Sequence, residues 1–217
     1  MIKALFSAVN DITSPELRGV LWKSIALSIA LFAALGFGIE FALSLITLIP
    51  WPWLLTTLQI VTGLGLFAAF FFLMAPVTAV FAGLFQDGIA AAVEKRHYQM
   101  DRPGRPLSWT AGLLAGLAFG ALSLAVNLVV WPLVIFGGFG AALILLANAY
   151  LIGREYFELS AARYMPMAQA KQIRRDNALR IWIAGLIPGA LAMVPFLNFV
   201  TPVFATSYFL HYYKNGS

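Results

Sequence analysis

Residues 106–153 read PLSWTAGLLAGLAFGALSLAVNLVVWPLVIFGGFGAALILLANAYLIG, a stretch without one charged side chain. A helix needs roughly 20 apolar residues to cross the hydrocarbon core, so this stretch has room for two passes. Two more uncharged stretches cover residues 41–86 and 181–210. Only 11% of the chain is charged, whereas a soluble domain carries about a quarter. The sequence therefore predicts an all-α integral membrane protein, formed by a single membrane domain over residues 1–217.

Prolines beside aromatic residues mark the places where the chain turns around. The corner Pro50-Trp51-Pro52-Trp53 divides residues 15–86 into a long helical hairpin, because proline ends helices and tryptophan suits the headgroup level of the bilayer. A second corner, Trp131-Pro132, divides another hairpin over residues 107–152. The two arms of the first hairpin are predicted to be long transmembrane helices.

The last uncharged stretch has shorter arms. Residues 181–194 would form a helix of about 21 Å, which is short for a full crossing. We therefore expect residues 181–213 to form a re-entrant hairpin that turns around Pro195 and Pro202. The predicted architecture is two long transmembrane helices plus helical hairpins, some of them partly penetrating, with roughly 4 to 6 membrane segments in all.

The polar parts of the chain fit this topology. Residues 1–13 carry apolar side chains at a spacing of three or four, which predicts an amphipathic helix in the membrane interface. The basic residues gather near the N-terminus and in residues 87–106 and 153–180, and none lies at a corner. By the positive-inside rule, 87–106 is a cytoplasmic loop, 153–180 is a basic cytoplasmic helical segment, and both termini are cytoplasmic.

The distribution of basic residues along the chain also indicates which partners to expect. The net charge of +5 is accounted for by membrane topology, so membrane lipids are expected as partners and nucleic acid is not. The basic residues of 153–180 would meet anionic headgroups or form a vestibule that concentrates anions. Gly112, Gly116 and Gly120 recur every four residues and form a stripe for close helix packing, within the chain or in a homo-oligomer.

Catalytic and metal-binding patterns are scarce. The chain has no cysteine and no nucleophile-elbow, zinc-protease or phosphate-loop motif. Its two histidines, His97 and His211, lie outside the uncharged stretches and lack the spacing of metal ligands. Glu155 and Glu158 lie one helical turn apart among arginines, which favours an ion-paired helix junction. We therefore expect no enzyme activity, no metal and no cofactor.

Glu40 is the exception, because its carboxylate stands in an apolar segment. Gln59 would lie at a similar depth across the first hairpin, and Asn198 is a further buried polar candidate. An intramembrane carboxylate is a functional candidate, so Glu40, Gln59 and Asn198 form a possible intramembrane polar site. The alternative is a polar clamp that only joins helices.

Several stretches, in order along nearly the whole chain, resemble one family. They are VPFLNFVTPVFAT at residues 194–206, the basic helix at 171–180, Ala75-Pro76, the charged segment 94–96 and SPELR at 14–18. These resemble the etoposide-induced protein 2.4 superfamily, and within it the bacterial CysZ-type sulfate permeases. The resemblance implies two long spanning helices with partly penetrating hairpins. It also implies sulfate passage for sulfur assimilation, in a multi-pass protein of the bacterial inner membrane.

The resemblance also implies an anion site. The family's sulfate site looks like Gly-Leu/Ile-Arg-Arg beside the first long helix, and Leu17 and Arg18 match it. Glu16 replaces the glycine and Gly19 replaces the second arginine. We expect Leu17, Arg18 and Gly19 to bind sulfate or a similar oxyanion at the helix start, where free N–H groups attract anions. The alternatives are a non-transporting membrane scaffold or assembly protein and, less favoured by the residues, an intramembrane enzyme.

Overall fold

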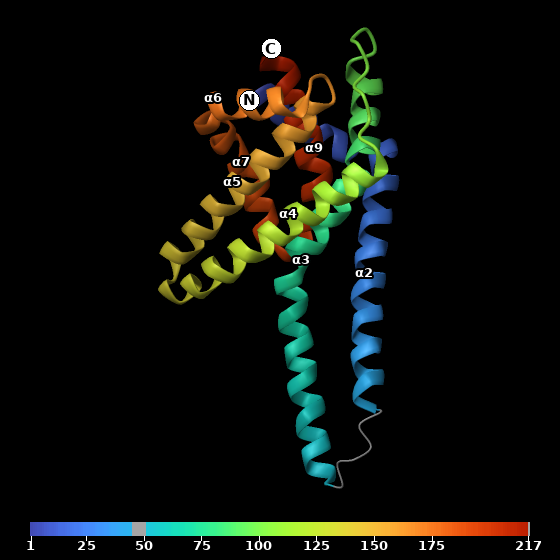
Figure 1. Ribbon diagram of the computed structural model, residues 1–217, viewed down its shortest axis with the longest axis vertical. Helices are drawn as coiled ribbons and strands as arrows, with labels where there is room; N and C mark the ends of the chain where they lie inside the picture. The colour runs from blue at the N-terminus through green and yellow to red at the C-terminus, as the bar shows by residue number, and fades with distance from the viewer. Residues whose placement is uncertain (45–50, 217) are drawn as a thin grey trace.

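The computed structural model describes residues 1–44 and 51–216, and every regular element in these ranges is helical. Figure 1 shows two long helices, α2 (Pro15–Ser44) and α3 (Pro52–His97), crossed by the hairpin of α4 (Trp109–Val130) and α5 (Gly138–Ala162). The short 3₁₀ helix η1 (Trp131–Phe136) forms the tip of that hairpin. The remaining elements are α1 (Ile2–Ile12), α6 (Met167–Asp176), α7 (Ala178–Met193), α8 (Pro195–Asn198) and α9 (Thr201–Gly216).

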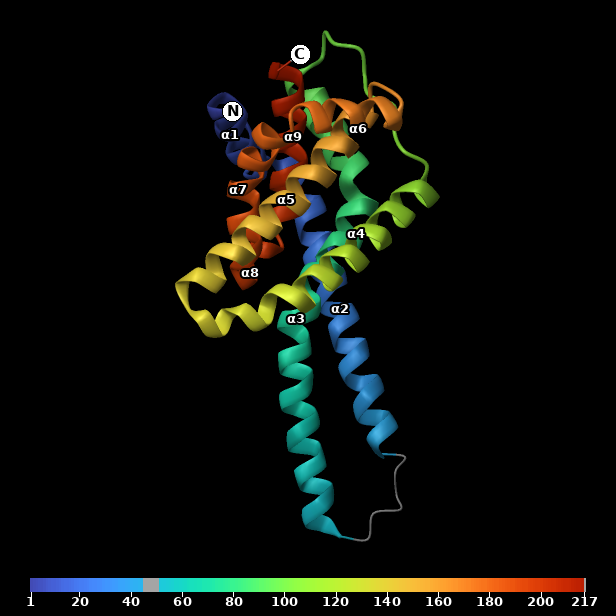
Figure 2. The same cartoon turned by 60° about the vertical axis from the view of Figure 1, so that its left-hand side comes forward.

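The α2–α3 hairpin extends well beyond the rest of the protein at one end. In Figures 1 and 2 the end of α2 and the start of α3 stand apart from the other helices, and both chain termini lie at the opposite end. Trp51 precedes Pro52, which is the first residue of α3, as expected of a proline corner. Pro50, the other proline predicted at this corner, lies outside the described residues.

The second long helix continues further than the sequence indicated. We predicted that it would end at Gln86 and that residues 87–106 would form a loop, but α3 runs on to His97. The physical reason is a small amphipathic face at the end of α3: Ile89, Ala90 and Val93 are buried against Leu17 of α2. Their spacing of one, three and four residues places them on one face of a helix.

The predicted second hairpin is present, with different boundaries. Within α4, the segment Gly112–Val130 has 19 residues and a mean hydropathy of 2.2, which is long and apolar enough to cross a membrane. Gly137 joins η1 to α5 with a φ of +63°, a conformation that side chains other than glycine rarely adopt. Residues 153–180, predicted as one basic helical segment, are divided between three helices: α5 continues to Ala162, α6 follows, and α7 begins at Ala178.

Glycines bring α5 and α7 into backbone contact. A Cβ placed on Gly185 would lie 2.0 Å from the carbonyl oxygen of Ala149, and one on Gly153 would lie 2.7 Å from the carbonyl oxygen of Ile181. Only residues without side chains allow helices to approach this closely. The helix α7 has 16 residues, in keeping with the short arm predicted for the last hairpin.

The C-terminal helix α9 is the centre of the core. Every residue from Thr201 to His211 is buried, and Phe204, Tyr208 and Phe209 pack in a cluster with residues of α1, α4, α5 and α7. The predicted amphipathic helix is α1, but it packs through its small side chains: Ala4 and Ala8 are buried. Ile2, Phe6 and Val9 are exposed in the protein alone, whereas Leu5 and Ile12 are partly buried against the core.

Candidate functional site

The start of α2 is the predicted anion-binding element. Leu17 is 2% exposed and packs against α3 and α9, so its side chain positions the helix rather than facing a ligand. Arg18 and Gly19 are exposed, and no described side chain pairs with the guanidinium. Ser14 caps the helix, because its Oγ accepts from the N–H of Leu17 at 3.4 Å and its carbonyl accepts from the N–H of Arg18 at 3.0 Å. The exposed guanidinium of Arg18 is therefore the main group that this turn offers to an anion.

The three residues of the predicted intramembrane polar site are not all described and do not share one place. Glu40 lies near the end of α2 and is exposed, and the side chain of Gln59 lies outside the described residues. Asn198 ends α8, which lies far from the Ser44 end of α2 in both ribbon views. It lines a small cavity of about 30 Å³ together with Asn148 and Ser123, which is the volume of about one water molecule.

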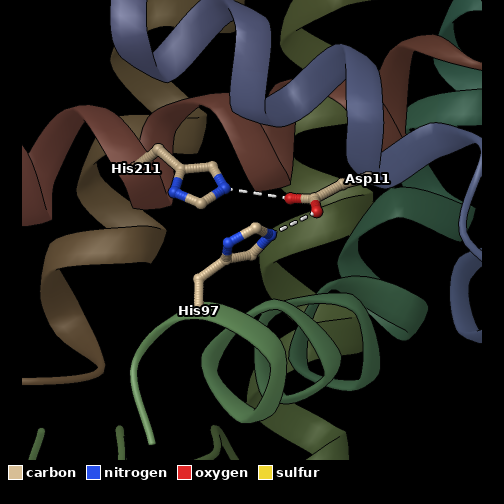
Figure 3. A group of neighbouring side chains, drawn as sticks. All are labelled: Asp11, His97 and His211. Carbon is tan, nitrogen blue, oxygen red and sulfur yellow. Dashed lines mark hydrogen bonds and ion pairs between the residues drawn. The ribbon is translucent and has the colours of Figure 1, made fainter. Parts of the chain in front are cut away.

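A cluster of side chains, buried except for His97, joins α1, α3 and α9 at the end of the protein that carries both termini. We call Asp11, His97 and His211 the Asp11 cluster; Figure 3 shows both imidazole rings turned toward the carboxylate. His97 Nε2 lies 2.7 Å from Asp11 Oδ1, and His211 Nε2 lies 2.9 Å from Asp11 Oδ2. Ser207 donates to Asp11 Oδ2 at 2.6 Å, and the Tyr98 hydroxyl lies 2.7 Å from His211 Nδ1.

The surroundings of Asp11 keep its carboxylate charged. Burial would by itself raise the pKa of Asp11, but hydrogen bonds from His211, Ser207 and His97 outweigh it and hold the pKa below the usual value of 3.8. Asp11 is fully buried, and a buried charge is stable only when it is paired and hydrogen-bonded. The cluster therefore joins three helices through one ionised group.

A second ion-pair network surrounds Arg163, directly after α5. Arg163 is 4% exposed and donates to Glu94 from Nε at 2.9 Å and from Nη2 at 3.2 Å, while its Nη1 bonds Asp87. Tyr164 adds a hydrogen bond to Glu94 at 2.6 Å. Burial would raise the pKa of Glu94, but the bonds from Arg163 and Tyr164 hold it low; at Asp87 burial prevails and raises the pKa. The network ties the end of α3 to the end of α5.

The two cavities at this end differ in charge. One, of about 450 Å³, has Asp87, Glu94 and Asp101 in its wall, together with Lys95 and Arg163. The other, of about 510 Å³, is lined by Arg180 and by polar residues such as Asn177 and Tyr212. None of the described residues that line this second cavity is acidic. Of the two, only the Arg180 cavity has the charge that an anion requires.

Glu155 and Glu158 were predicted to form an ion-paired helix junction, and Glu158 forms such ion pairs. Glu158 is buried, and its Oε1 lies 2.6 Å from Arg174 Nε and 3.9 Å from Arg154 Nε. The Glu158–Arg174 pair joins α5 to α6, whereas Arg154 lies one turn before Glu158 within α5. The Glu158–Arg174 pair therefore has a structural use.

Comparison with known protein families found a match that covers most of the chain. The model of the family described as sulfate transporter CysZ/etoposide-induced protein 2.4 matches residues 4–202. The chain belongs to this family. The match includes α1 and the hairpins and reaches into α9, and thus contains Arg18, Arg163 and most of the Asp11 cluster. No curated protein matches the chain.

Membership of the CysZ/etoposide-induced protein 2.4 family and the apolar segment of α4 both indicate a membrane protein. The family is one of transporters rather than enzymes. The Asp11 cluster was missed by sequence reasoning, since Asp11, His97 and His211 come from distant parts of the chain. One signal could have found Asp11: with Ala4 and Ala8 it forms one helical face, opposite the large apolar residues.

Proposed function

We propose that this chain is a membrane permease for an inorganic oxyanion, with sulfate as the first candidate substrate. The family match over residues 4–202 carries the proposal. Large apolar side chains that are exposed in the protein alone, such as Phe37 on α2, Val129 on α4 and Ile135 in η1, support a lipid-facing surface. By the resemblance to CysZ-type permeases, the membrane would be the bacterial inner membrane.

The anion would meet two cationic elements at the end that carries both termini. Arg18 offers an exposed guanidinium, which binds tetrahedral oxyanions through paired N–H donors. Arg180 lines a cavity whose described wall contains no carboxylate, so it suits a vestibule that concentrates anions before they reach the membrane. The basic residues of α6 add to the field. This end would face the cytoplasm by the positive-inside rule.

The test is uptake of radiolabelled sulfate into liposomes that contain the purified full-length chain. We expect sulfate uptake well above that of empty liposomes, and competition by other tetrahedral oxyanions. Arg18→Ala should lower uptake about tenfold, the effect of losing about 1.4 kcal/mol of anion binding. Lys23→Ala removes another exposed cation five residues further along α2 and should leave uptake unchanged.

The role of the Arg180 cavity is tested by a second pair of variants, one with its substitution in the cavity and one with its substitution outside it. Arg180→Ala should lower uptake severalfold at low salt and less at high salt, because the attraction of a vestibule is screened. Arg175→Ala removes an exposed arginine that does not line the cavity and serves as the control. Uptake at the level of empty liposomes, with folded protein, would refute the permease proposal.

The scaffold alternative loses one of its arguments. The stripe of Gly112, Gly116 and Gly120 is buried within this chain, and α4 packs against α3. These glycines are therefore used inside the protein, and their spacing no longer favours a partner helix from another chain.

A further inference from the structure

We propose that the Asp11 cluster binds a divalent first-row transition metal ion, with zinc as the representative. One imidazole nitrogen from each histidine and a carboxylate oxygen of Asp11 all lie within 4.8 Å of one another. Two histidines and one carboxylate are a common protein ligand set for zinc, with the fourth position left to water. The three side chains come from α1, from the end of α3 and from α9, so the ion would join three helices.

The distances fit an ion after small side-chain rotations. Zinc–nitrogen and zinc–oxygen bonds of about 2.0–2.2 Å place neighbouring ligand atoms of a tetrahedral site about 3.4 Å apart. His97 Nε2 and His211 Nε2 now lie 2.7 Å and 2.9 Å from Asp11 oxygens, and they must retreat by about 0.7 Å and about 0.5 Å. The side chain of His97 is 28% exposed, so it has room to turn and also gives an ion access from solvent.

The surrounding groups already orient the ligands. A metal on Nε2 of His211 leaves the ring proton on Nδ1, where the Tyr98 oxygen lies 2.7 Å away and can accept it. The hydroxyl of Ser207 holds Asp11 Oδ2 at 2.6 Å. Partners of this kind fix the ring orientation and carboxylate of metal ligands in proteins. One group opposes the ion: Arg96 Nε lies 3.8 Å from Asp11 Oδ1, but its side chain is 36% exposed and can turn to solvent.

The ligand chemistry selects the class of ion. Two imidazoles favour zinc and its first-row neighbours over magnesium or calcium, which prefer oxygen ligands. The chain contains no cysteine, so it offers none of the thiolates that would select copper(I). The carboxylate of Asp11 is fully buried. It would partly neutralise the charge of a bound divalent ion.

The experiment is metal binding to the purified full-length chain in detergent, prepared with a tag that contains no histidine. The chain has two histidines, and both belong to the Asp11 cluster, so histidine-dependent binding reports on this site alone. After treatment with a chelator, zinc is titrated by calorimetry, and cobalt(II) is added as a visible-absorption probe. We expect one zinc per chain, a raised unfolding temperature and a tetrahedral cobalt spectrum.

The variants separate a metal site from a hydrogen-bonded junction. His97→Ala and the more conservative His97→Gln should each weaken zinc binding at least tenfold and abolish the tetrahedral cobalt spectrum; the second serves if the first does not fold. Tyr98→Phe removes the outer contact to His211 and should weaken binding about tenfold. Asp101→Asn removes a nearby exposed carboxylate and should change nothing. Zinc affinity that is the same in wild type and in both His97 variants would overturn the proposal. So would a wild-type protein that binds no zinc.

Discussion

Gly185→Ala should separate α5 from α7, and the size of the effect follows from the geometry. The added Cβ would lie 2.0 Å from the carbonyl oxygen of Ala149, whereas real Cβ atoms essentially never come closer than 3.0 Å to a neighbouring atom. One backbone must therefore shift by about 1 Å relative to the other. The obstructing atom belongs to the backbone, so it cannot rotate away as a side chain would.

The rest of the α5–α7 interface is packed too closely to absorb this movement. A Cβ on Gly153 or on Gly189 would also be closer than 3.0 Å to the facing backbone, which shows that the contact is tight along its length. A gap of 0.5–1 Å loses about a quarter to a half of each dispersion contact. We therefore expect a loss of about 3 kcal/mol, at the upper end of the range for overpacked cores.

The assay is thermal unfolding in mild detergent, followed by tryptophan fluorescence at a fixed protein concentration. For a chain of this size, a loss of about 3 kcal/mol lowers the melting temperature by about 6–12 °C. Gly88→Ala is the matched control, because a Cβ there would have no atom within 4 Å. It should melt at or slightly above wild type, since alanine favours a helix by about 0.5–1 kcal/mol. A Gly185→Ala protein that melts within about 2 °C of wild type would refute the close α5–α7 contact.

Three further outcomes follow from the charged groups. Arg163→Met should lower the free energy of unfolding by about 3–5 kcal/mol, because it leaves the buried Glu94 and the partly buried Asp87 without their cation; denaturant titration measures this, and a loss below about 1 kcal/mol would contradict it. Because the pKa of Asp11 is lowered on folding, its contribution to stability is fully present above pH 3.8 and is lost as the pH falls through the lower folded value. Asp11→Asn should remove this acid-dependent part from melting curves recorded at falling pH, and an unchanged pH profile would show that Asp11 is not held in this way. Arg18→Ala should lower sulfate uptake about tenfold while its melting temperature stays at the wild-type value, whereas a parallel fall of both would assign Arg18 a structural use.

Local sequence patterns predicted the helical segments well, for physical reasons. Proline fixes its own φ and ends or begins helices, so the helix start at Pro52 and the hairpin turn at Trp131-Pro132 could be read directly. The amphipathic spacing of residues 1–13 likewise gave α1. The end of α3 was predicted wrongly, because Ile89, Ala90 and Val93 form an apolar face too short to stand out among charged neighbours.

The candidate site was harder to predict from the sequence than the helices were. The cluster of Asp11, His97 and His211 depends on three helices meeting, and no spacing along the chain encodes that meeting. The same is true of Asn198, which was predicted as a buried polar residue and lines one small cavity together with Asn148. Arg18 was named from a family resemblance, and the structure adds that Ser14 already holds the neighbouring N–H groups.

Sulfate flux is the measurement that tests the central claim most directly. Proteoliposomes with wild-type chain, Arg18→Ala and Lys23→Ala are compared with empty liposomes under one sulfate gradient. The permease account predicts rapid uptake with wild type and Lys23→Ala, and about a tenfold loss with Arg18→Ala. Wild-type uptake equal to that of empty liposomes, from protein that is folded and inserted, would contradict it.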